Sequence, residues 1–207
     1  MHLAAKGSHV DALRLLLVGD VSLFINLADE DGVTALHWAA LNGPAAAVTK
    51  LLQRDALANA ETTTMETPLH WAARCEDPAV ASAIVKSLVG KKATIDPRRR
   101  DSGMTPLHVA CSMGNVAAVM ALLDAGAMVN VGDNNERSAL HLACIGNHVS
   151  TVEVLLSRKA QVDLVDRRHR TALHHASAAG HAACVAVLIS AFAVVDAQCQ
   201  GFFIIYY

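Results

Sequence analysis

Aromatic side chains are scarce in this sequence. Phe, Tyr and Trp make up 4% of the 207 residues, although hydrophobic residues of all kinds make up 53%. A globular enzyme of this size usually packs its core with more aromatic rings. Here Ala, Leu and Val supply the apolar surface, and such side chains favour thin layers of helices that approach one another closely.

Charge and long apolar runs are also limited. The 17 Lys and Arg and the 19 Asp and Glu leave a formal net charge of −2, which excludes a globally basic nucleic-acid binder but not a local basic patch. No run approaches the roughly 18 apolar residues of a membrane span. The amino-terminal segment MHLAAKGSHV lacks the uninterrupted apolar stretch of a signal peptide.

Paired cysteines are missing as well. The five cysteines form no Cys-x-x-Cys motif, and their odd number and wide spacing argue against a disulfide framework. We therefore expect a protein of a reducing compartment, the cytoplasm or the nucleus. The cysteines are Cys75, Cys111, Cys144, Cys184 and Cys199.

One repeated pattern fills most of the chain. Five Leu-His pairs recur at spacings of 33, 38, 33 and 33 residues, each followed by small residues and then by an apolar pair such as Leu122-Leu123. Thr105 can cap a helix, and Pro106 suits the first helical position. Gly126 can end the second helix in the left-handed conformation. The repeated histidines are His37, His70, His108, His141 and His174.

The segments that carry these histidines resemble the ankyrin repeat, whose Thr-Pro-Leu-His motif recurs about every 33 residues. They read TALHWAALNG, TPLHWAARCE, TPLHVACSMG, SALHLACIGN and TALHHASAAG. The resemblance implies an all-α solenoid of stacked helix-turn-helix units with β-hairpin fingers. It also implies structural histidines, each bonding back to its own Thr and to the neighbouring turn backbone. We expect one array over 1–201 with about six units, near 1–33, 34–66, 67–104, 105–137, 138–170 and 171–201.

The pattern breaks in three ways. The third unit is five residues longer than its neighbours, and we place most of the insertion at 89–92 and one residue in the finger at 97–100. Met65, Glu136 and His169 stand where a turn glycine is usual, so each must accept a positive φ or distort its finger. Residues 202–207 read FFIIYY, an apolar tail that is either foreign to the repeat or a strand or plug packed on the last helix pair.

Nothing in the pattern predicts catalysis. Cys111 and Cys144 occupy a small-residue position, where a buried thiol is unreactive. His174 and His175 are helix neighbours that point about 100° apart, so they cannot readily chelate zinc together. Phosphate-binding loops, dinucleotide-binding turns and zinc-protease motifs are missing from the sequence. We therefore expect no enzyme, no cofactor and no metal site.

The resemblance implies that a protein partner binds the concave face, which the finger tips and the exposed positions of the first helices form. Trp38 and Trp71 stand at equivalent positions on that face. They either pack on each other or offer a flat apolar contact to a partner. Further contacts are expected from Leu41, Arg74 and Met113.

The charge of the fingers changes from negative to positive along the chain. Asp29, Glu30, Asp31 and Glu61 make the early fingers acidic, while seven arginines make the later ones basic. Either these are ordinary solvated loop charges, or they form a bipolar groove whose later half attracts an acidic or phosphorylated segment. Nucleic acid is not expected, because interleaved aromatic residues are missing. The arginines are Arg98, Arg99, Arg100, Arg137, Arg167, Arg168 and Arg170.

We interpret the chain as a monomeric protein-interaction scaffold or adaptor. The alternative is a regulatory or targeting fragment of a larger multidomain protein, such as an enzyme or a channel. Sequence beyond either end would separate the two, since further repeats favour a scaffold and a kinase, ligase or membrane motif favours the fragment. The partner stays open, because one fold hosts many binding functions.

Overall fold

A computed structural model describes residues 24–191 of the chain. Most of the expected first unit and the whole of the tail 202–207 lie outside the described residues. The count of six units therefore stays a prediction.

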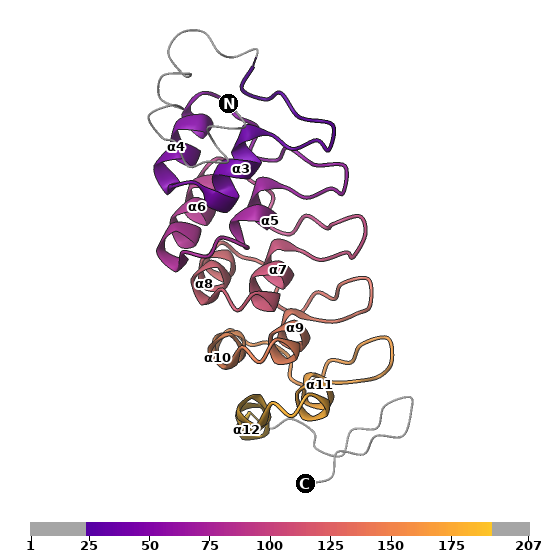
Figure 1. Ribbon diagram of the computed structural model, residues 1–207. Coiled ribbons are helices and arrows are strands. Elements are labelled where there is room, and N and C mark those ends of the chain that lie inside the picture. Colours follow the sequence, from indigo (N-terminus) through magenta and orange to yellow (C-terminus); the bar gives the residue numbers. More distant parts are fainter. Residues whose placement is uncertain (1–23, 192–207) are drawn as a thin grey trace.

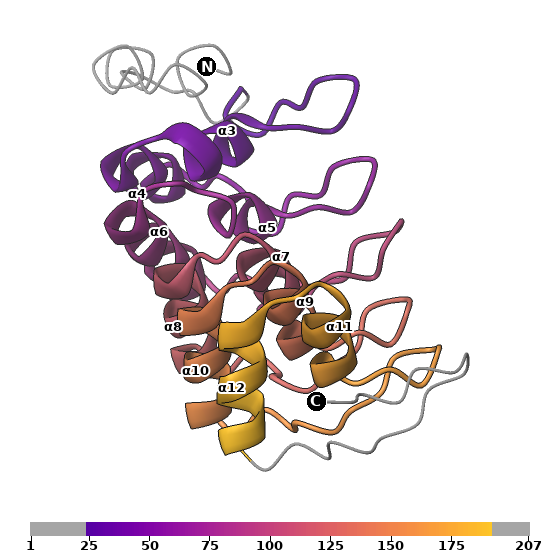
Figure 2. The ribbon, with the colours of Figure 1, turned by 60° about the horizontal axis from the view of Figure 1, so that its bottom comes forward.

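The described residues form five helix pairs, stacked in one elongated array (Figure 1). The inner helices form one column, the outer helices form a second, and the fingers all project on the inner side (Figure 2). This is the all-α solenoid that the sequence predicts. The inner helices are α3 (Ala35–Asn42), α5 (Pro68–Ala72), α7 (Pro106–Ser112), α9 (Ala139–Ile145) and α11 (Ala172–Ala178). The outer helices are α4 (Ala45–Gln53), α6 (Pro78–Gly90), α8 (Val116–Asp124), α10 (Val149–Ser157) and α12 (Ala182–Ser190).

Each inner helix begins at a Thr or Ser whose backbone is extended, with the repeated histidine three residues later. In α7 the backbone N–H of Thr105 donates to Nδ1 of His108 at 3.2 Å. The ring proton therefore sits on Nε2, which donates at 3.1 Å to the carbonyl of Arg137, the residue just before the cap of the next inner helix. His108 thus fixes the start of its own helix and ties it to the finger that leads into the following unit. The same link joins His37 to Glu66, His70 to Met104 and His141 to Arg170.

The core consists of aliphatic side chains between the two helix columns. Leu107 of the Leu-His pair is 1% exposed, and Leu122 of the outer helix is fully buried. Each such burial stabilises the fold by about 2 kcal/mol relative to an exposed side chain. Ala39 and Ala40 are also fully buried, and their small size lets successive inner helices approach closely.

Five fingers project from the described residues, with tips at 29–33, 62–66, 98–104, 133–137 and 166–170, which we number first to fifth. The first finger precedes α3, and the other four connect successive helix pairs. In the fourth finger the N–H of Asp133 donates to the carbonyl of Arg137, and the N–H of Glu136 donates back to Asp133, both at 2.9 Å. The N–H of Asn134 reaches Ser102 of the third finger at 2.8 Å. Hydrogen bonds therefore close each finger and join neighbouring fingers.

The fingers are tight turns rather than extended ribbons. Within residues 24–191 the one β-bridge is the antiparallel pair Ala28 and Thr34, in the first finger. Met65, Glu136 and His169 take φ values of 60°, 61° and 57°. Of the two outcomes expected for a missing glycine, these residues accept the left-handed conformation.

The insertion in the third unit lengthens an outer helix. Helix α6 has 13 residues, whereas α8 has nine, so four inserted residues add about one helical turn. Its end at Gly90 agrees with the insertion point predicted at 89–92. No helix within 24–191 is long and apolar enough to cross a membrane.

Candidate functional site

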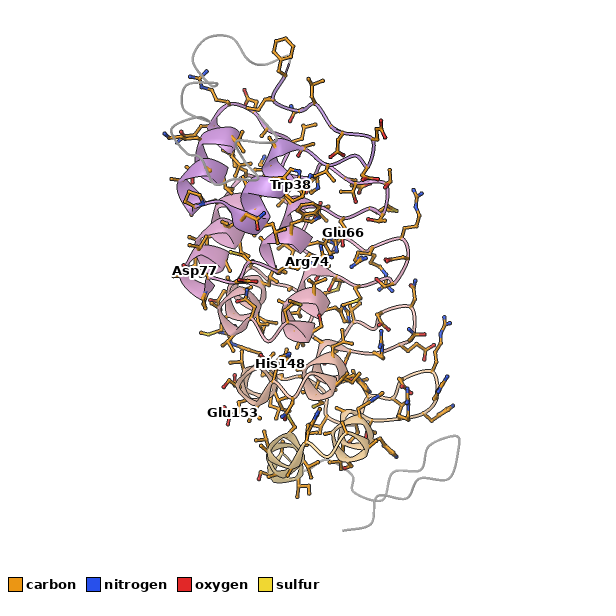
Figure 3. The ribbon with its side chains drawn as sticks, viewed as in Figure 1. Trp38, Glu66, Arg74, Asp77, His148 and Glu153 are labelled. Carbon is orange, nitrogen blue, oxygen red and sulfur yellow. The ribbon has the colours of Figure 1, made fainter. Side chains whose placement is uncertain are left out.

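The candidate site is the face of the inner helices that looks toward the fingers, which we call the groove. Its floor at the ends of the inner helices includes Leu41, Arg74, Met113 and Ile145. The side chain of Met113 is 56% exposed and that of Ile145 is 39% exposed, whereas Leu41 is half-buried. Figure 3 shows Trp38, Glu66 and Arg74 on the finger side of the inner helices and Asp77 beside the outer helices.

The two tryptophans pack on each other. The rings of Trp38 and Trp71 meet edge to face, with centroids 5.1 Å apart and an interplanar angle of 89°. Trp71 is 9% exposed and its indole N–H donates to Oε2 of Glu66 at 2.9 Å. Of the two roles considered for this pair, the structure shows mutual packing, and Trp71 has little surface left for a partner.

Glu66, the last residue of its unit, gathers three donor side chains from the following unit, an arrangement we call the Glu66 cluster. Besides the Trp71 indole, Arg74 donates to both carboxylate oxygens and Arg99 of the third finger lies 3.0 Å from Oε1. Burial alone would raise the pKa of Glu66, but the hydrogen bonds and charges of the two arginines outweigh it and hold this pKa below its ordinary value. The cluster therefore stays ionised and joins α5 to the next finger.

In the fourth and fifth fingers, an arginine donates hydrogen bonds to an aspartate of the same finger. Arg137 donates from Nε and Nη2 to Oδ2 of Asp133 at 2.9 and 2.7 Å. Arg170 makes the same contacts to Asp166 at 3.0 and 2.8 Å. Burial raises the pKa of Asp166, yet the bonds from Arg170 and neighbouring backbone groups outweigh this effect, so its pKa is strongly lowered. These side chains stabilise the fingers and contribute little net charge to the groove.

The imidazole of His175 adds a third donor to Asp166. Its Nε2 lies 3.0 Å from Oδ2, and its ring meets that of His141 at 5.7 Å in an edge geometry. His175 occupies the position of Trp38 and Trp71 in its unit. In the sequence analysis His175 is considered only in connection with zinc, and this partner is not foreseen.

The seven predicted finger arginines therefore divide into two groups. Arg99, Arg137 and Arg170 are half-buried and bonded to carboxylates. The remaining four are exposed to solvent. An Asp-x-x-x-Arg spacing in the fourth and fifth fingers is the signal that could have revealed two of these pairs from the sequence. The exposed arginines are Arg98, Arg100, Arg167 and Arg168.

Two hollows flank the turn between α5 and α6. One, of about 700 Å³, is lined by residues including Leu41, Pro44 and Val80. The other, of about 350 Å³, is lined by residues including Met113 and Val116. Both share Arg74, Cys75 and Glu76 as a common wall.

Burial shifts the pKa values of several described histidines and cysteines. Burial lowers the pKa of His70 and His141 to about 4, against the bonds to backbone carbonyls that favour the charged ring. Burial raises the pKa of the Cys111 and Cys144 thiols. In residues 24–191 no three His, Cys, Asp or Glu side chains lie close enough together to hold a metal ion.

Comparison with known proteins places this geometry in a family. The profile described as "Ankyrin repeats (3 copies)" matches residues 1–62, 48–133, 78–166 and 128–200. Tyrosine-protein kinase Shark of Drosophila melanogaster is 37% identical over 99 residues, which are 48% of this chain and 10% of that protein. The transient receptor potential cation channel subfamily A member 1 homolog of Caenorhabditis elegans is 33% identical over 139 residues, 58% of this chain and 11% of the channel.

Neurogenic locus notch homolog protein 1 of Xenopus laevis is 34% identical over 122 residues, which are 59% of this chain and 5% of that protein. The chain thus spans about a tenth or less of the length of these curated relatives. The family profile, in contrast, extends over nearly all of the sequence. The chain therefore belongs to the ankyrin-repeat family.

Proposed function

We propose that this chain is a protein-interaction scaffold or adaptor whose groove binds a segment of another protein. The observation that carries the proposal is the exposed apolar floor. Met113, which follows α7, exposes 56% of its surface at the edge of a hollow of about 350 Å³, although Leu107 and Val109 of that helix are buried. Exposed apolar side chains that rim a hollow are typical of binding surfaces.

The hollows support a segment rather than a small molecule as the ligand. They lie side by side along the array, separated by the wall that Arg74, Cys75 and Glu76 form, and neither is enclosed. A side chain of the partner would fill each hollow while its backbone crosses the wall. Leu41 and Met113 then provide apolar contact at the two far edges, and Arg74 provides charge between them.

The proposal assigns no catalytic role. In the described units, His37, His70, His108 and His141 use both ring nitrogens in hydrogen bonds that hold the fold. The four described cysteines are buried free thiols. Such thiols suit a reducing compartment, so we place the protein in the cytoplasm or the nucleus, as a monomer before it binds.

The test is capture of partner proteins from a cell extract by the full chain, with mass spectrometry as the readout. Met113→Asp should reduce the recovery of a groove partner about tenfold, because a charge would replace an apolar contact. Met120→Asp is the matched control, since Met120 lies on the outer helix α8 with 42% exposure. Equal recovery with both variants would contradict binding through the groove.

A second candidate role is a regulatory or targeting segment of a larger protein. It rests on the relatives, each of which is about nine times longer than the matched region or more. An antibody raised against residues 98–104 should then detect an endogenous protein much larger than 21.8 kDa. A single band near that mass would favour the scaffold reading.

A further inference from the structure

The four exposed finger arginines form two separate pairs. Arg98 and Arg100 lie on the third finger, and Arg167 and Arg168 lie on the fifth. The fourth finger stands between them and exposes Glu136, which is 64% exposed and lies 3.8 Å from the equally exposed Arg167. An ion pair this long and this exposed to solvent contributes little to stability. The basic surface is therefore interrupted rather than continuous.

The spacing of the two pairs follows from the stack. Packed helices lie about 8–10 Å apart, so fingers separated by two units stand about 20 Å apart. An extended chain advances about 3.3 Å per residue, so about six residues span that distance. A partner that contacts both pairs must therefore carry its anionic groups in two clusters.

The two arginines of the third finger make different hydrogen bonds. Nη1 of Arg98 donates to the carbonyl of Gly132 at 2.9 Å, toward the fourth finger. The backbone N–H of Arg100 instead donates to Thr64 of the second finger at 2.9 Å. The guanidinium of Arg98 also lies so close to Gly103 that a Cβ added to this glycine would collide with it. Carboxylates suit these exposed arginines, because a guanidinium can bind a carboxylate through two parallel N–H donors.

The opposite end of the finger row has the opposite sign. Glu30 and Asp31 of the first finger and Glu61 before the second are all exposed. Charges of opposite sign at the two ends fix the direction in which a charged segment can bind, because the reversed direction places like charges together.

Resting on the proposed function, we propose that the partner is an extended protein segment with two clusters of Asp or Glu about six residues apart. One cluster faces Arg98 and Arg100, and the other faces Arg167 and Arg168. A neutral or basic residue lies opposite Glu136. Apolar side chains between the clusters contact Met113 and Ile145 on the groove floor.

The test begins with selection of binders to the full chain from a displayed library of random peptides of about 16 residues, which reach about 50 Å when extended. We expect the selected peptides to share two acidic clusters around an apolar centre. Their affinity is then measured for the chain and for charge-reversed variants. Arg98→Glu with Arg100→Glu should weaken binding about tenfold, and so should Arg167→Glu with Arg168→Glu.

The matched control reverses the same charge elsewhere. Lys86 and Lys91 are exposed at the outer helix α6 and its end, so Lys86→Glu with Lys91→Glu should leave affinity within about twofold. A peptide of the same composition with all its acidic residues in one cluster should bind about tenfold less tightly than the selected form.

The outcomes separate this inference from the proposed function. The inference is wrong if the selected peptides lack acidic clusters, or if they bind all the charge-reversed variants as tightly as the unchanged chain. Binding through the groove still stands in that case, provided that Met113→Asp abolishes binding of the peptides. Tighter binding of single-stranded DNA than of any selected peptide would also overturn the inference. If the library yields no peptide that depends on Met113, the proposed function itself fails.

Discussion

The two ends of the groove neutralise their buried carboxylates in different ways. At the early end, Glu66 draws its side-chain donors from the unit that follows it, namely Trp71, Arg74 and Arg99. At the later end, Asp133 and Asp166 each hold the arginine four residues further along the same finger, and Asp166 also binds His175 of the next unit. The carboxylate of Glu66 therefore crosslinks two units, that of Asp133 stabilises its own finger, and that of Asp166 does both. The exposed finger charges differ as well, since they are acidic at the early end and include the remaining arginines at the later end.

Both ends of the groove contain the hydrogen-bonded, buried repeat histidines. Lowering the pH should therefore reduce the stability of both ends. Burial lowers the pKa of His70 and of His141 from 6.5 to about 4, and the unfolded chain therefore binds more protons between these values. Stability must then fall as the pH falls. These two residues predict a loss of about 4 kcal/mol in unfolding free energy from about pH 8 to about pH 5.

Urea unfolding across this pH range measures the effect. His141→Gln should remove its own share of this loss, about 2 kcal/mol, and leave the share due to His70. A stability that stays constant across the range would show that the histidines are not held neutral by burial.

The Glu66 cluster gives the sharpest test of the difference between the ends. Glu66→Gln should lower the free energy of unfolding by about 3 kcal/mol, because it leaves Arg74 and Arg99 without their shared carboxylate. Asp133→Asn should cost about 1 kcal/mol, since an amide oxygen can still accept the backbone bonds of the fourth finger. If urea unfolding shows equal losses of unfolding free energy for the two variants, a carboxylate that crosslinks two units stabilises the fold no more than one that bonds within its own finger.

The turn residues give a smaller contrast between fingers. Gly103→Ala should destabilise the fold by about 2 kcal/mol, because its φ of 68° disfavours a side chain and the added Cβ would collide with Asn134. Glu136→Gly should stabilise it by about 0.5 kcal/mol, since φ there is 61°. Thermal unfolding of the two variants should shift in opposite directions, and a shift in the same direction would contradict this account.

Local patterns in the sequence predicted most of the fold. Thr105 and His108 lie three residues apart, and the capping that this spacing permits is decided within one turn. Counting residues between repeats located the insertion near the end of α6 but did not show that it adds a helical turn. The Glu66 cluster did not follow, because its members are 5, 8 and 33 residues from Glu66 and meet only in the folded stack. Summing finger charges also hid the pairing of Arg137 and Arg170, although both lie four residues after an Asp.

The acceptors of the histidine links have a consequence for how such a chain changes over time. Glu66, Met104, Arg137 and Arg170 all accept through the main-chain carbonyl, which every residue type possesses. Mutation can therefore exchange the side chain at this position without breaking the joint between units. Duplication of a unit preserves the joint as well, while the groove acquires a new chemical group. Descendants of one ancestral repeat can in this way diverge in what they recognise and keep the same architecture.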